Sequence, residues 1–182
     1  MRQVCQFRSR SLLYYIHNKV SVNRFWPATK GLILIIKRIS WHDIEYIWKT
    51  FLWPDRISAI EPTSAMVYLN GYNSMNMTYL PSFFGCFVDA KLVGVNSGHR
   101  CADNSYRSRG LWVDPLYRGN GYGKTLLETT VRQAMEESSS FIWSFPRRTS
   151  WPTYKSVGFK KTSKWMQSET SDANSYCIIL FD

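Results

Sequence analysis

The sequence predicts a mixed α/β domain in which a central sheet of about six to seven strands is flanked by about four helices. The first observation behind this is size, because 182 residues, 45% of them hydrophobic, suit a single core. The second is that strand-like and helix-like segments follow one another along the chain. The third is a strand that runs directly into a glycine-rich loop and then a helix.

The first thirty residues differ in composition from the rest of the chain. They contain six lysines and arginines and no acidic residue, within a chain whose net charge is +10. Such a balance favours acidic partners such as phosphates, nucleic acid or an anionic cofactor, although a merely soluble basic surface would have the same composition. We expect residues 1–30 to be a basic N-terminal extension and residues 31–182 to form the domain.

The first elements of the domain are a strand and a helix. The run LILIIKRI, over Leu32–Ile39, is short and β-branched and predicts a buried strand. Ser40, followed three residues later by Asp43, forms a capping box at the start of a helix. Apolar residues recur at spacings of three and four over Trp41–Trp53, and Pro54 ends the helix.

The next segments predict a short helix and a hairpin. The short helix is expected over 62–69, and a polar loop over 70–77. The segment FFGCFVDAKLVGVNSGH, over Phe83–His99, predicts two antiparallel strands that meet at a turn near Asp89–Lys91. The residues after it, Arg100–Ser108, are a loop or a frayed strand.

A strand, the glycine-rich loop and a longer helix come next. The segment RGLWVDP, over Arg109–Pro115, predicts a strand that ends at Asp-Pro. The helix is expected over 121–137. Its apolar face is expected to consist of Leu127, Val131, Ala134 and Met135.

The end of the chain predicts three more strands and a short helix. FIWSF, over Phe141–Phe145, reads as a strand, and residues 151–156 as a helix. The last two strands are expected over Phe159–Gln167 and Tyr176–Phe181, joined by a polar turn over 168–174.

Several classes of protein are not expected from this composition. The four cysteines are widely scattered, without C-x-x-C spacing and without a histidine at ligand spacing, so we expect reduced structural thiols and no metal site. The longest apolar run, Leu32–Ile36, is too short to cross a membrane. No small-residue cleavage site follows the N-terminal apolar stretch, so a cytoplasmic protein is expected.

The loop LYRGNGYGKTLL, over Leu116–Leu127, excludes two familiar nucleotide motifs. A P-loop would need its first glycine at position 118, which is Arg118. A dinucleotide fingerprint that starts at Gly119 would need its third glycine at Lys124, and one that starts at Gly121 would need it at the leucine after Thr125.

What remains is R-x-x-G-x-G, at Arg118, Gly121 and Gly123, between a strand and a helix. Glycines let backbone N–H groups approach an anion closely, and the helix N-terminus adds the positive end of its dipole. Lys124 adds a further charge. The loop therefore predicts an anion-binding site, where a simple capped helix after a tight turn would need fewer glycines.

Two motifs resemble those of a known superfamily. LWVDPLYRGNGYGKTLL, over Leu111–Leu127, resembles the acetyl-CoA signature of the GNAT superfamily, the Gcn5-related N-acetyltransferases. YKSVGF, over Tyr154–Phe159, resembles the Tyr-x-x-x-Gly-Phe block that closes their cofactor-binding core. The resemblance covers roughly residues 31–182. It implies a V-shaped splay between the two central parallel strands, and transfer of an acetyl group from acetyl-CoA (coenzyme A) to an amine.

The resemblance also implies which residues bind the cofactor. The pyrophosphate of CoA would lie on the loop, where Thr125 adds a hydroxyl. The pantetheine arm would pair with the backbone of the preceding strand. The loop residues are Arg118, Gly119, Asn120, Gly121, Tyr122, Gly123, Lys124 and Thr125, and the strand residues are Leu111, Trp112 and Val113.

Two residues are candidates for the chemistry. Tyr154 matches the tyrosine that often protonates the departing thiolate in this superfamily, but it could also be an aromatic packed beneath the cofactor helix. His99, at the end of a hairpin strand, is the best-placed titratable residue for a general base, although a histidine there is often simply exposed. The backbone N–H at about Val113 could donate to the tetrahedral oxyanion.

The acceptor stays open in the sequence. Many family members carry Asn seven residues before the tyrosine, where this chain has Arg147, followed by Arg148; this pair could contact CoA phosphate or an acidic acceptor, or form a solvated loop. Together with Arg100, Arg107 and Arg109 they suggest a polyanion. We therefore retain three hypotheses: acetylation of a small-molecule or protein amine, modification of a nucleic-acid-linked amine or nucleobase, and non-catalytic binding of CoA or nucleic acid.

Overall fold

The computed structural model describes residues 33–57, 60–62, 80–101, 103–167 and 172–181. The predicted basic extension, most of the helix expected over 62–69, and the loop over 70–77 lie outside these residues, and the domain boundary stays a prediction. The strands are β1 (Leu34–Arg38), β2 (Ser82–Val88), β3 (Lys91–Arg100), β4 (Ser105–Val113), β5 (Phe141–Ser144), β6 (Lys160–Lys161) and β7 (Cys177–Leu180). The helices are α1 (Trp41–Ile47), α2 (Tyr122–Glu136) and α3 (Trp151–Val157), with short helical turns η1 (Trp48–Leu52), η4 (Pro115–Tyr117) and η5 (Arg148–Ser150).

The seven strands form one sheet in the order β1-β2-β3-β4-β5-β7-β6. β4 and β5 run parallel, and every other neighbouring pair is antiparallel. This confirms the predicted mixed sheet of about six to seven strands. None of the helices in the described part of the chain is both long enough and apolar enough to span a membrane.

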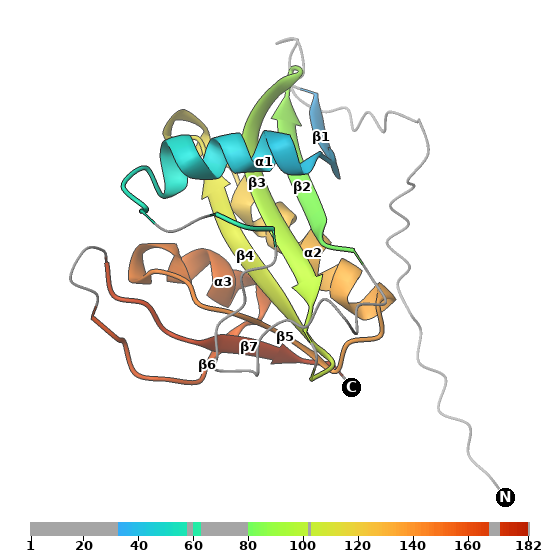
Figure 1. Ribbon diagram of the computed structural model, residues 1–182, viewed down its shortest axis with the longest axis vertical. Helices are drawn as coiled ribbons and strands as arrows, with labels where there is room; N and C mark the ends of the chain where they lie inside the picture. Colours follow the sequence, from blue (N-terminus) through green and yellow to red (C-terminus); the bar gives the residue numbers. More distant parts are fainter. Residues whose placement is uncertain (1–32, 58–59, 63–79, 102, 168–171, 182) are drawn as a thin grey trace, which may run out of the picture. The chain divides into compact units, whose positions relative to one another are not determined.

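Two helices cover opposite faces of the strands β2 to β4. α1 crosses the front of these strands in Figure 1 and α2 lies behind them, beside α3. On the α1 side, Ile44 and Trp48 are buried against Val95. On the α2 side, Leu126 packs against apolar side chains of β2 and β3, and Leu127 joins a second cluster that reaches β5 and α3. Both faces of the central strands are therefore inside the protein, which explains their nearly continuous burial.

The first helix begins as its sequence predicts. Asp43 N donates to Ser40 Oγ at 3.2 Å and Ser40 N donates to Asp43 Oδ2 at 3.1 Å, which is the reciprocal capping box. After Ile47 the helix widens into the π-helical turn η1, which ends before Pro54. The predicted helix over 41–53 is thus one continuous helical segment with a wide last turn.

The first strand is where the predicted burial is wrong. β1 pairs only with β2, so it forms one edge of the sheet. Leu34 and Ile35 remain 45% and 49% exposed. A short run of β-branched residues predicts a strand equally well at an edge and at the centre, because that pattern carries no information about what covers the strand.

The hairpin of β2 and β3 is confirmed. Asp89 and Ala90 both have positive φ, 47° and 68°, which matches the right-handed twist of the strands that they join. Part of the segment after it, expected as a loop or frayed strand over Arg100–Ser108, is regular strand, because β3 continues to Arg100 and β4 begins at Ser105. The serines and arginines of this segment obscure the alternating apolar pattern of a strand. They are buried only by the packing of neighbouring elements.

The long helix α2 is confirmed, with one correction to its buried face. Leu127 and Ala134 are buried as expected, but Met135 is 57% exposed. Leu126 and Thr130 are buried in its place, because the buried face is rotated toward the strands under the helix. The predicted last two strands shorten to the two-residue β6 and to β7.

The two parallel strands separate in the middle of the sheet. β4 pairs with β5 only over Ser105–Arg107, opposite Phe141–Trp143. β5 then ends at Ser144 while β4 continues to Val113. The second half of β4 therefore has an open edge beside the end of β5, and this is the predicted splay.

Candidate active site

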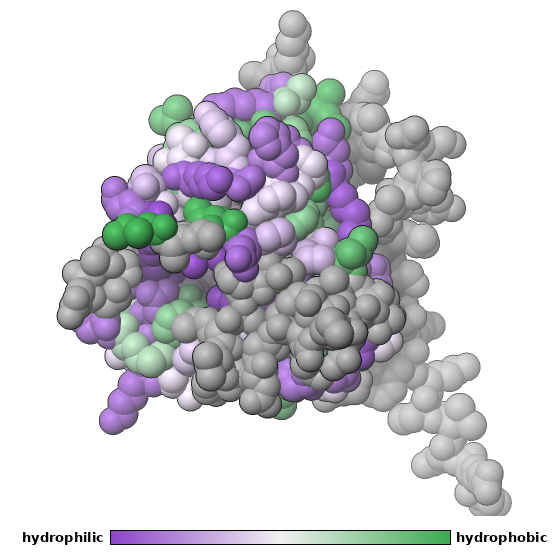
Figure 2. Space-filling model, in the orientation of Figure 1, coloured by the Kyte–Doolittle hydropathy of each residue, from purple (hydrophilic) through white to green (hydrophobic). Residues whose placement is uncertain are grey.

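A cavity of about 360 Å³ lies where β4 and β5 diverge, a volume suited to a small molecule. Its walls come from the end of η1 and the segment after it, the middle of β4, the residues at and after the end of β5, and α3. In Figure 2 the surface is hollowed below the end of α1, and hydrophilic residues are visible in the hollow. The lining residues are Leu52, Trp53, Arg56, Arg107, Ser108, Arg109, Gly110, Leu111, Ser144, Phe145, Pro146, Arg147, Ser150, Tyr154 and Asn174.

The open edge of β4 presents backbone groups toward the splay. Asp114 N donates to Val93 O of β3 at 2.8 Å, and because successive residues of a strand point their amides to opposite sides, Val113 points its N–H and C=O away from β3. Leu111 shares this orientation with Val113. Trp112 pairs with β3 instead, and its side chain stacks on Phe51 with 5.2 Å between ring centroids.

A bulge bends β4 next to the cavity. Gly110 has φ 71° there, and an alanine Cβ at this position would overlap the indole of Trp48. Trp48 Nε1 donates to Gly110 O at 2.8 Å, and Ser97 Oγ donates to Arg109 O at 2.9 Å. These bonds give a donor to carbonyl groups that the irregular strand ladder leaves without a backbone partner. They therefore hold the bulge in one conformation.

The glycine loop has the backbone that its sequence predicts. Gly119 and Gly121 both have φ 82°, and no heavy atom lies within 4 Å of an added Cβ at either position. Glycine is therefore required there by backbone conformation rather than by crowding. Thr125 N donates to Gly121 O at 3.1 Å as the first bond of the α2 ladder, so the amides of Tyr122 to Lys124 precede that ladder.

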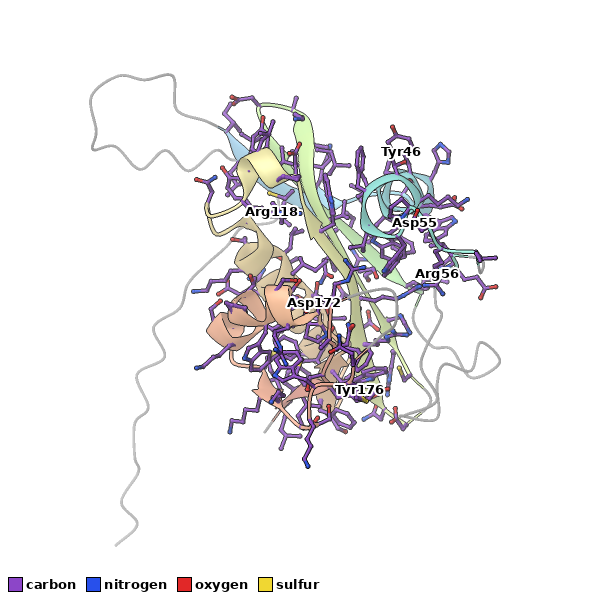
Figure 3. All side chains as sticks on the ribbon, turned by 90° about the vertical axis from the view of Figure 1, so that its left-hand side faces the viewer. Tyr46, Asp55, Arg56, Arg118, Asp172 and Tyr176 are labelled. Atoms are coloured by element: carbon purple, nitrogen blue, oxygen red, sulfur yellow. The ribbon has the colours of Figure 1, made fainter. Side chains whose placement is uncertain are left out.

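The charged residues of the loop differ in how they are held. Arg118 Nε donates to Val113 O at 3.0 Å, which ties this guanidinium to the end of the open strand. Lys124 pairs with Glu128 on the helix surface at 3.7 Å. In the side view of Figure 3, Arg118 at the head of α2 and Arg56 beyond η1 lie on opposite sides of the sheet. Arg56, which lines the cavity, and Arg118, which belongs to the glycine loop, thus approach β4 from different directions.

Tyr154 lies at the inner part of the cavity. It is carried by α3, is 3% exposed and packs edge-on against Phe159. Its Oη lies 3.3 Å from Ser144 Oγ, which in turn donates to Ser108 O at 2.9 Å. Burial raises the pKa of the Tyr154 hydroxyl well above its ordinary value, so the group stays protonated across the physiological range.

His99 is placed differently from its sequence prediction. Its side chain is 1% exposed, it pairs across the strands with Arg107, and it is not among the cavity-lining residues. Burial, and then the charges of Arg107 and Arg109, lower the pKa of His99 to about 3. His99 is therefore not among the residues that the cavity brings together with Tyr154, and its role as general base stays a prediction. The alternative of an exposed histidine is wrong, because the side chain is buried.

Four arginines line the cavity: three of them, Arg107, Arg109 and Arg147, belong to the set that suggested a polyanion from the sequence, and Arg56 was not part of it. Arg107 and Arg109 are 8% and 5% exposed, and burial lowers the pKa of their guanidinium groups to about 10 and about 9. Arg56 comes from the segment after η1 and Arg147 from the segment after β5. The alternation of Arg107 and Arg109 along a strand was an available signal, because residues two apart share a face.

Comparison with known proteins agrees with this geometry. The model of the acetyltransferase (GNAT) family matches residues 42–159. A comparison with curated proteins found no match.

Solved structures share the fold at low sequence identity. An acetyltransferase of the GNAT family from Staphylococcus aureus Mu50 is 15% identical with a TM-score of 0.55, covering 80% of this chain and 98% of that one. The ribosomal-protein-S18-alanine N-acetyltransferase from Escherichia coli is 15% identical with a TM-score of 0.54, covering 80% and 91%. The PaiA N-acetyltransferase from Thermoplasma acidophilum, in complex with coenzyme A, is 15% identical with a TM-score of 0.54, covering 82% and 99%.

Proposed function

This chain belongs to the GNAT family of acetyltransferases, which use acetyl-CoA, and from that premise we propose that it acetylates the amine of a small molecule. The observation that carries the choice of a small molecule is the cavity of about 360 Å³ at the open edge of β4, which is lined by residues from several separate parts of the chain. In the reaction a bond forms between the amine nitrogen and the acetyl carbon, the carbon–sulfur bond breaks, the nitrogen loses a proton and the sulfur gains one.

The loop and the open strand fit the cofactor. Acetyl-CoA, when bound, supplies an acetyl group activated as a thioester. The early amides of α2, with Arg118 fastened beside them, are suited to the diphosphate because they combine N–H donors, a helix dipole and a guanidinium. The backbone groups of Leu111 and Val113 on the open side of β4 are suited to the amide-bearing pantetheine arm.

Tyr154 is the hydroxyl donor that we assign to the departing sulfur. It lines the cavity, and its raised pKa keeps the proton in place at neutral pH. An ordinary thiol has a pKa of about 8.5, below that of this tyrosine, so Tyr154 donates a hydrogen bond that stabilises the thiolate, and the thiolate takes up through water the proton that the amine releases. Ser144, 3.3 Å away, orients the hydroxyl.

The acceptor amine must be neutral to react. The cavity favours the neutral amine even though no carboxylate side chain is there to act as a base. Among the described residues that line it there is no Asp, Glu or His. The arginines of the wall disfavour a nearby ammonium ion, because like charges lower the pKa of a bound amine. The chain thus selects the deprotonated amine by electrostatics, and water can take the proton.

Titration calorimetry with CoA tests the cofactor assignment. Gly119→Ala and Gly121→Ala should each weaken CoA binding by about tenfold or more, because alanine disfavours positive φ and blocks close approach to the amides. Gly158→Ala is the matched control: Gly158 also has positive φ (107°) and open space around it, but it lies at the end of α3. All three variants should lose similar stability, while only the loop variants lose affinity. Wild-type protein that binds no CoA would end the proposal.

A further inference from the structure

The cavity wall is strongly cationic. Arg56, Arg107, Arg109 and Arg147 all line it, and no carboxylate side chain is among the described residues that do. They come from three separate parts of the chain: the segment after η1, β4, and the segment after β5. Tertiary folding therefore gathers four positive charges around one volume of about 360 Å³.

Aromatic rings hold the two buried arginines in place. The guanidinium carbon of Arg109 lies 5.0 Å from the ring centroids of both Trp48 and Trp53, and Arg109 Nη1 donates to the backbone oxygen of Glu61. The guanidinium carbon of Arg107 lies 4.9 Å from the ring centroid of Trp143. These contacts fix where the charges sit, which is what a recognition site requires.

Such an arrangement is costly without a ligand. Guanidinium groups that are nine-tenths buried have lost most of their hydration, and each raises the energy of its neighbours. Aromatic faces replace part of that hydration and the charge of Glu61 favours the charged form of Arg109, but the charges of Arg107 and Arg56 still disfavour it. An oxyanion bound between the arginines would cancel this repulsion, and planar guanidinium groups match carboxylate and phosphate oxygens two at a time.

We propose that the acceptor is a small amine that also carries an oxyanion, a phosphate or a carboxylate, which binds among the arginines of this cavity. The inference rests on the proposed function, because it identifies the class of acceptor for that reaction. The wall runs from the exposed Arg56 to Tyr154, which is 3% exposed. A molecule anchored by its anion within that wall is held with its amine close to the tyrosine. The volume of about 360 Å³ suits a small molecule.

Calorimetry on the full chain saturated with CoA tests this with three matched amines. The probes are 2-aminoethyl phosphate, β-alanine and ethanolamine, which share an aminoethyl skeleton and differ in the charge of the other end. We expect at least one of the two anionic amines to bind about tenfold or more tightly than ethanolamine, because charge-assisted hydrogen bonds carry that difference. The comparison between the two anions tells phosphate from carboxylate. Release of CoA thiol from acetyl-CoA with the same amines should follow the same order.

Two neighbouring arginines supply the variant and its control. Arg147 lines the cavity and its Nη2 lies 3.5 Å from Leu52 O, whereas Arg148 is exposed and its guanidinium carbon lies 5.2 Å from the Trp165 ring centroid. Arg147→Gln should remove most of the preference for the anionic amine. Arg148→Gln makes the same change of charge in the same segment and should leave the preference unchanged.

Each outcome decides between the alternatives. Equal affinity for all three amines, no binding of any of them to the CoA-saturated protein, or equal loss in Arg147→Gln and Arg148→Gln overturns the anionic acceptor while leaving CoA binding intact. A single-stranded oligonucleotide that binds tightly and competes with 2-aminoethyl phosphate also overturns it, in favour of a nucleic-acid acceptor. Failure to bind CoA refutes the proposed function instead, and the amine titrations without CoA then still report on the cavity.

Discussion

Replacing His99 by glutamine should change how stability depends on pH. The pKa of His99 is lowered from 6.5 to about 3 in the native state, by burial and by the charges of Arg107 and Arg109. Between these two values the unfolded chain binds a proton that the native protein does not. The contribution of His99 to the free energy of unfolding is therefore fully present above pH 6.5 and is lost as the pH falls toward 3.

The magnitude follows from the same two values. Each pH unit below 6.5 costs about 1.4 kcal/mol, so at pH 5.0, 1.5 units below it, wild-type protein should have lost about 2 kcal/mol through His99. Glutamine keeps a polar side chain of similar length that does not titrate. The free energy of unfolding of His99→Gln should consequently fall less steeply with pH, and the gap to wild type should narrow by about 2 kcal/mol between pH 7 and pH 5.

Urea unfolding followed by tryptophan fluorescence at pH 7, 6 and 5 measures this difference. The matched control is His42→Gln, which makes the same substitution at an exposed position of α1. Parallel slopes for wild type and His99→Gln would refute the reasoning, since they would show that His99 takes up its proton in the folded protein.

Three further substitutions test other parts of the structure. Tyr154→Phe should lower kcat by about 10- to 100-fold in thiol-release assays while the Kd for CoA is unchanged, because only the hydroxyl donated to the sulfur is lost; equal loss in both would point to a packing role. Gly110→Ala should destabilise the protein by about 2–5 kcal/mol in urea unfolding, because it combines positive φ with overlap on Trp48. A loss in free energy of unfolding as small as that of Gly119→Ala would contradict the bulge geometry. Ser40→Ala should cost about 1 kcal/mol by removing the capping box, and no change would mean that the cap is not populated in solution.

Much of the fold could be predicted from short stretches of sequence. The capping box of Ser40 and Asp43, the hairpin turn at Asp89 and Ala90, and the glycine loop before α2 each depend on backbone geometry within a few residues. Local geometry of this kind is determined by the residues that adopt it, so these predictions were confirmed.

Burial was harder to predict, because it depends on what packs over an element. The run at Ile35 predicts a strand correctly but not its exposure at the edge of the sheet. Met135 fits the helical period of α2 and is nevertheless exposed. His99 looked like an accessible strand-end residue and is buried.

The chain's own sequence thus determined the order of most elements, the glycine-rich loop before α2 and the family to which the protein belongs. Only the tertiary structure decided that Arg56, Arg107, Arg109 and Arg147 share one cavity with Tyr154, and that His99 stays outside it. The physical reason is the separation along the chain of the residues involved. A loop or a cap is formed by neighbours in sequence. The charge of a cavity is instead the sum over side chains up to about ninety residues apart, which the packing of the whole sheet brings together.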